Sequence, residues 1–102
     1  MDFYLAKNRK ELDIILAYLE KNDYYWVDGN LPTDLFKKKL TYQRHYDEIK
    51  SLLSKEELVI VNNKGLTFGA LDRILDDYAS PSMITVDMIE PVFIEWEWWY
   101  GF

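Results

Sequence analysis

The chain has 102 residues, of which 49% are hydrophobic and 17% aromatic, and its net charge is −6. This length and composition predict a single folded domain over residues 1–102 and exclude a disordered protein. The negative charge argues against direct binding to nucleic acid phosphates, and the absence of cysteine excludes disulfides, cysteine-held zinc and thiol catalysis.

The first third of the chain predicts a strand followed by an amphipathic helix. Residues 3–6 form a short β-prone run. Asn8 is a favourable N-cap residue, and Glu11 follows three positions later, as in a capping box. The apolar residues of the helix recur at helical spacing: Leu12, Ile15, Leu16 and Leu19. The charged residues that fall off this face are Lys10, Asp13, Glu20 and Lys21.

The middle of the chain predicts a strand, a helical turn and a second helix. Residues 24–27 are β-prone and are closed by a turn at residues 28–30. Residues 32–34 can open a short helical turn. Thr41 is a candidate cap for the second helix, whose shared face consists of Tyr42, Tyr46, Ile49 and Leu53.

A hairpin signal follows, because residues 58–61 and 66–68 flank Asn62-Asn63-Lys64-Gly65, where Asn and Gly tolerate positive φ. A third short helix is predicted from the spacing of Leu71, Ile74, Leu75 and Tyr78. After a break at residues 80–82, residues 83–86 and 92–100 predict two last strands. This order implies an α+β domain, with a mostly antiparallel sheet of four to five strands packed against two to three helices.

The negative charge is concentrated in the last third of the chain. Residues 71–102 contain seven acidic residues and one base, Arg73, whereas residues 1–70 contain eleven of each. In a strand over residues 92–100, Glu95, Glu97 and Trp99 share one face. That face is either the solvated edge of a core strand or an interface, and the residues leave both interpretations open.

The acidic third supplies the candidate site. One interpretation of its helical acids is a plain solvated face, and the other is a surface that steers a basic partner. On the second interpretation the partner-binding residues are Asp72, Asp76, Asp77, Asp87, Glu90, Glu95, Glu97 and Trp99. No set of residues predicts catalysis, a metal site or a cofactor, so the chain is expected not to be an enzyme.

Three segments carry a resemblance to a known group of proteins. Residues 11–21, residues 25–29 and the run Val59 to Gly69 resemble small proteins of phages and prophages of Gram-positive bacteria, which pair an amphipathic helix with a tryptophan-containing strand and a hairpin. The resemblance covers roughly residues 3–70, and residues 22–24 replace the usual glycine-containing turn. It implies a genomic setting, and small phage proteins include many inhibitors of host machinery.

The leading hypothesis is therefore a noncatalytic protein-binding module of phage or mobile-element type. Its acidic, aromatic surface would inhibit or modulate a host protein with a basic surface, such as a nucleic-acid-binding one, and an anti-defence role such as anti-CRISPR fits. The expected location is the host cytoplasm, since no apolar run reaches the roughly 20 residues that span a bilayer. The alternatives are an assembly protein that forms a homodimer through its C-terminal strand, and an immunity protein or antitoxin.

Overall fold

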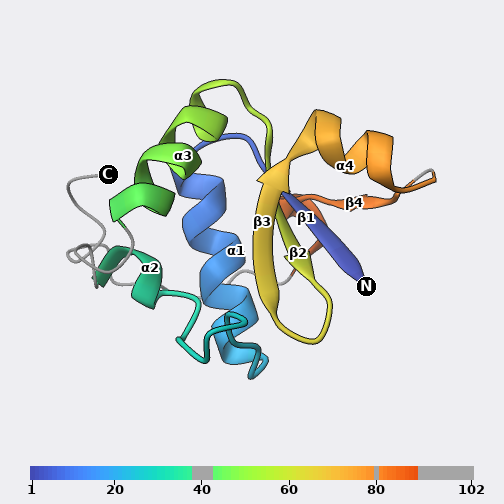
Figure 1. Cartoon of the computed structure of the whole chain (residues 1–102). Helices are drawn as coiled ribbons and strands as arrows, with labels where there is room; N and C mark the ends of the chain where they lie inside the picture. Colours follow the sequence, from blue (N-terminus) through green and yellow to red (C-terminus); the bar gives the residue numbers. More distant parts are fainter. Residues whose placement is uncertain (38–42, 80, 90–102) are drawn as a thin grey trace.

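A computed structural model of the chain describes residues 1–37, 43–79 and 81–89. These residues form four α-helices, four strands and one 3-10 helix (Figure 1). In chain order these are β1 (Asp2–Ala6), α1 (Arg9–Lys21), α2 (Asp34–Lys37), α3 (Gln43–Ser54), β2 (Leu58–Asn62), β3 (Leu66–Ala70), α4 (Leu71–Asp77), β4 (Met83–Ile84) and η1 (Val86–Met88). No helix in these ranges is long and apolar enough to cross a membrane.

The four strands form one sheet in the order β3-β2-β1-β4. The pairs β1–β2 and β2–β3 are antiparallel, and the short β4 lies parallel to β1. The central strand β2 is buried along its whole length, as expected for a strand covered on both faces. The predicted α+β class and the mostly antiparallel sheet are therefore confirmed, with four strands.

Helix α1 begins as its sequence predicts. Asn8 Oδ1 accepts a hydrogen bond from Glu11 N at 2.9 Å, and Glu11 Oε1 accepts one from Lys7 N at 3.1 Å, which satisfies two donors at the helix start. The placement of Asp13 outside the buried face is wrong. Its side chain is only 2% exposed, and Arg9 Nε donates to its carboxylate at 2.7 Å. Burial raises the pKa of Asp13 from 3.8 to about 6, although Arg9 acts in the opposite direction.

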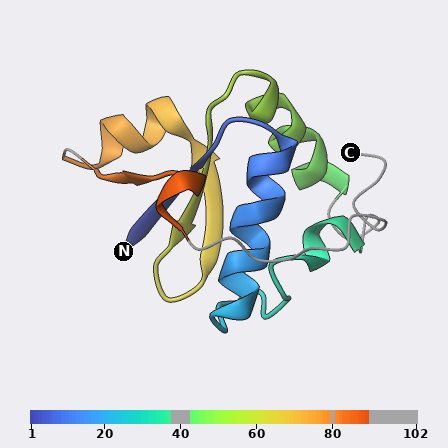
Figure 2. The ribbon, with the colours of Figure 1, turned by 180° about the vertical axis from the view of Figure 1, so that it is seen from behind.

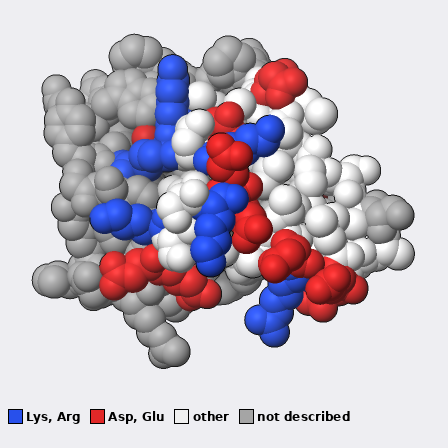
Figure 3. Space-filling view, turned by 90° about the horizontal axis from the view of Figure 1, so that it is seen from above, with Lys and Arg blue, Asp and Glu red and all other residues white. Residues whose placement is uncertain are grey.

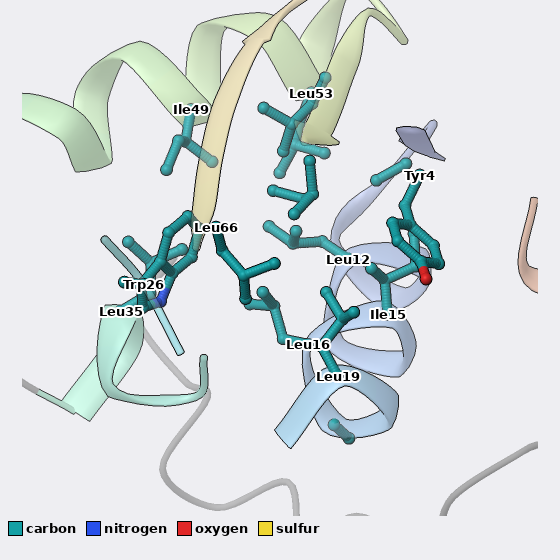
Figure 4. Close-up of a cluster of buried hydrophobic side chains, with 14 residues drawn as sticks. Tyr4, Leu12, Ile15, Leu16, Leu19, Trp26, Leu35, Ile49, Leu53 and Leu66 are labelled. Carbon is teal, nitrogen blue, oxygen red and sulfur yellow. The ribbon is translucent and has the colours of Figure 1, made fainter. Parts of the chain in front are cut away.

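The larger core lies between the sheet and helices α1 and α3 (Figures 1 and 4). Alternation along the strands turns Tyr4 and Ile60 toward these helices, where they meet the apolar face of α1. The buried residues contributed by α1 are Leu12, Ile15, Leu16, Ala17 and Leu19. The apolar face predicted for this helix is thus confirmed as the face that packs in the core.

Helix α4 covers the opposite face of the sheet, as the two views in Figures 1 and 2 show. A smaller cluster forms there from Phe3, Val59, Val61 and Ile74. Tyr78, just after α4, places its ring edge-on against Phe3, with ring centroids 5.0 Å apart. The sheet is therefore the middle layer between α1 and α3 on one side and α4 on the other.

The loop between α1 and α2 differs from the strand predicted over residues 24–27. Only Trp26 forms a bridge there, parallel to Leu66. The backbone instead closes on itself, since Trp26 N donates to Asn30 O at 2.9 Å and Gly29 N donates to Trp26 O at 2.8 Å. Thr33 ties the loop to α1, because its backbone N–H donates to Glu20 Oε1 at 3.2 Å and its hydroxyl donates to the same oxygen.

Of the other predicted elements, the helices are present and one strand is shorter than predicted. The helical turn after residue 32 is present as α2, and the second and third helices are present as α3 and α4. The strand predicted at residues 83–86 is shorter, because η1 begins at Val86 after the Thr85 hydroxyl binds the Asp87 carboxylate. The cap at Thr41 and the strand at residues 92–100 lie outside the described residues.

The β2–β3 hairpin is confirmed, with a turn one residue shorter than predicted. Asn62 pairs with Leu66 as the last residue of β2. The turn places Lys64 at φ 59° and Gly65 at φ 147°, and the latter is a conformation that favours glycine. A Cβ on Gly65 would lie 2.8 Å from Val27 Cγ1, so the turn also lies tightly against the loop after α1.

We therefore expect Gly65→Ala to reduce the free energy of unfolding by about 1–3 kcal/mol, because it adds backbone strain and a clash with Val27. Urea denaturation followed by circular dichroism measures this loss. Gly29→Ala is the matched control, since its φ is also positive, at 90°, but no atom lies within 4 Å of the added Cβ. Equal losses in both variants would contradict the close contact at Gly65.

Candidate interaction surface on α4

The start of helix α4 is held in place by the end of β3 and by the residue before β2. It begins directly after β3, and its first residue, Leu71, donates its backbone N–H to Glu57 O at 2.7 Å. Ile74 is buried against the sheet, and Leu71 is half-buried beside it. The outward side of the helix exposes three of the acids that the sequence singles out: Asp72, Asp76 and Asp77.

The three acids of α4 stand in different electrostatic settings. Asp72 lies in the first turn, where the helix dipole favours a carboxylate, and it accepts a hydrogen bond from Arg73 N at 2.8 Å. Asp76 and Asp77 lie in the last turn, where the carbonyl end of the helix disfavours negative charge and no basic residue is present. Within the described ranges, neither carboxylate makes a hydrogen bond or an ion pair. The helix gains no stability from these two groups.

Apolar side chains accompany these acids. Leu75 is 52% exposed, although its spacing predicts a place on the apolar face of the helix with Ile74. The reason is geometric: a helix of seven residues touches the sheet along one line, which Leu71 and Ile74 occupy. Tyr78 is 38% exposed beyond its contact with Phe3. Helix α4 therefore exposes two apolar side chains as well as its acids, and sequence reasoning missed the exposure of Leu75.

Asp87 does not join the acids of α4. It lies in η1, where its neighbours Val86 and Ile89 pack against the α1 side of the sheet, whereas α4 packs on the opposite side. Its carboxylate accepts a hydrogen bond from the Thr85 hydroxyl, which lowers the pKa of Asp87. The continuous acidic surface expected from the sequence is thus split between two layers of the fold.

The remaining predicted site residues, Glu90, Glu95, Glu97 and Trp99, lie outside the described residues. Figure 3 shows acidic and basic side chains interspersed over the described part of the face seen from above. That face does not present one uninterrupted acidic area. The acids of α4 are therefore best understood as a local patch.

No group of three or more His, Asp or Glu side chains in residues 1–37, 43–79 and 81–89 could hold a metal ion. Comparisons of the chain with protein-family models, with curated proteins and with solved structures find no match. Function is therefore inferred from the placement and chemistry of the described side chains.

Proposed function

We propose that this protein is a noncatalytic protein-binding module that docks α4 onto a basic surface of another protein. The observation that carries the proposal is a helix that exposes Leu75 together with two carboxylates in its last turn, Asp76 and Asp77, which oppose the helix dipole. Apolar contact at Leu75 would supply binding free energy, and the carboxylates of α4 would steer and orient a cationic partner.

The resemblance to small phage proteins makes a host protein the proposed partner, encountered in the host cytoplasm. Binding would inhibit or modulate that protein by covering its basic surface. Nucleases and other nucleic-acid-binding proteins present such surfaces, because they must neutralise phosphates. An anti-defence role is therefore the proposed biological setting, and steric blockade is the proposed mechanism.

The double variant Asp76→Lys/Asp77→Lys tests this proposal. We expect it to abolish capture of a partner from a lysate of a Gram-positive host at low salt, because the two introduced ammonium groups would repel a basic surface. The matched control is Asp47→Lys/Glu48→Lys on α3, where two exposed adjacent acids undergo the same charge change. Equal losses in both variants, or retained capture in the first, would contradict the proposal.

The same variant separates binding from folding. Replacing carboxylates by cations in the last turn of α4 is expected to stabilise the protein by about 0.3–1 kcal/mol per site, since the helix dipole favours positive charge there. The melting temperature should therefore stay the same or rise while partner capture is lost. A fall in the melting temperature would show that Asp76 and Asp77 contribute to the fold.

A further inference from the structure

A concave surface lies at the end of the molecule away from α4. The loop after α1 and the tip of the β2–β3 hairpin lie side by side there, at the bottom of Figures 1 and 2. Between them lies an open cleft of about 330 Å³, whose lining residues include Tyr24, Tyr25, Val27, Asn62 and Lys64. An open cleft of this kind leaves room for a segment that enters and leaves at its sides.

Asn62 is the distinctive group of this cleft. It is the last residue of β2, paired with Asp2 of β1 and Leu66 of β3, and it is only 8% exposed. Its carboxamide makes no hydrogen bond with any residue in the described ranges. Buried amides are nearly always hydrogen-bonded, because leaving one unpaired costs its hydration without compensation. A ligand that bonds to Asn62 would supply the missing partners.

The walls of the cleft include three exposed apolar or aromatic side chains. Tyr24 is 40% exposed, Tyr25 is 48% exposed and Val27 is 68% exposed. The binding loops of antibodies are enriched in tyrosine, which offers a large contact area at a small entropic cost, and in serine, glycine and asparagine, which adapt their hydrogen bonds. The run from residue 24 to residue 30 has this composition, with two tyrosines, one glycine and one asparagine.

These walls are held in place before any ligand binds. Leu66 N donates to Tyr25 O at 2.9 Å, and Val27 N donates to Leu66 O at 3.2 Å, so the loop is hydrogen-bonded to the start of β3. Between them, Trp26 is buried and its indole N–H donates to Pro32 O at 3.1 Å. A preorganised surface loses less entropy on binding than a mobile one.

We propose that this cleft binds an extended peptide segment of a partner protein. The Asn62 carboxamide has one donor group beside one acceptor, which complements a backbone amide of the peptide. An apolar or aromatic peptide side chain would pack on Tyr25 and Val27. A polyanion is disfavoured, because the chain carries a net charge of −6 and Asp23 accompanies Lys64 in the lining. The site is independent of the surface proposed on α4.

The test is an NMR titration of the whole protein with N-acetyl-phenylalanine amide, which combines one aromatic ring with two amides. We expect saturable shifts of the Asn62 side-chain NH₂ and of the backbone amides at residues 24–27 and 62–65. The expected dissociation constant is on the order of 1 mM, as for other fragments of this size. The absence of a saturable shift up to about 20 mM would overturn the proposal. Tighter binding of adenosine monophosphate would overturn the choice of a peptide.

Two variants test whether the NMR shifts arise from binding in the cleft. Asn62→Leu removes the unpaired amide, so it should weaken binding about tenfold while the melting temperature stays the same or rises. Tyr25→Ala changes a half-exposed wall residue and should weaken binding by about fivefold or more without unfolding the protein. Met88→Ala, at a 65% exposed position on η1, is the control and should leave binding unchanged. Full binding by both cleft variants would overturn the proposal.

Discussion

Trp26→Ala is expected to reduce the free energy of unfolding by about 3–5 kcal/mol, the usual cost of removing a buried aromatic side chain. Trp26 is 8% exposed, and Figure 4 shows it beside Leu35 and Leu66 in the larger core. The substitution also leaves the Pro32 carbonyl without its indole donor. For a domain whose stability is typically about 5–15 kcal/mol, this loss is about a fifth or more of the total.

Urea denaturation followed by far-UV circular dichroism measures this effect. Trp26→Phe should cost less, since it keeps a ring in the core and removes the hydrogen bond to Pro32. The neighbouring Tyr25→Ala is the control, and its expected change is within about 0.5 kcal/mol because its side chain is half-exposed. A loss below about 1 kcal/mol for Trp26→Ala would mean that the loop after α1 does not depend on this anchor.

Asp13→Asn is expected to stabilise the protein at pH 7, against the usual effect of breaking an ion pair. The pKa of Asp13 is raised to about 6 because burial penalises the charged carboxylate more than Arg9 favours it. Between about pH 4 and 6 the folded state binds more protons than the unfolded state, so stability falls as the pH rises through this window. Above it, the charged Asp13 costs at most about 3 kcal/mol, which the asparagine would recover in part.

The measurement is the free energy of unfolding from pH 4 to pH 7 for both proteins. The part of the pH dependence that comes from Asp13 should be absent in the variant, so the gain should grow with pH and level off above about pH 6. Asp47→Asn, an exposed carboxylate on α3, should leave the profile nearly unchanged. If Asp13→Asn destabilised the protein at pH 7, the attraction between Arg9 and Asp13 would outweigh the cost of burial.

The two proposed surfaces have different origins in the sequence. Acids at Asp72, Asp76 and Asp77 are evident from composition, because a charge excess needs no knowledge of the fold. The exposure of Leu75 is not evident, since its spacing from Ile74 and Leu71 is typical of a buried helix face. The cleft at Asn62 is less evident still, because the turn residues predict the hairpin but do not show that the Asn62 carboxamide is buried without a hydrogen-bond partner in the described part of the chain.

The sequence by itself determined most of the local elements, because their signals lie within a few residues of one another, but it wrongly predicted a strand at residues 24–27. Asn8 and Glu11 mark the start of α1, and the spacing of Leu12, Ile15 and Leu16 defines its buried face. Gly65 marks the hairpin turn, because that turn needs a residue that tolerates positive φ. These signals suffice for the α+β class as well, since the order of strands and helices limits how the layers can stack.

Only the tertiary structure decided which side chains lose contact with water and which layers they share. Asp13 is buried and Leu75 is exposed against their periodicity, because burial depends on what packs over a helix and how far that neighbour extends. Asp87 is separated from the acids of α4, because β4 pairs parallel with β1 and the chain then turns to the α1 side of the sheet. Both proposed surfaces depend on such long-range contacts, which no local pattern contains.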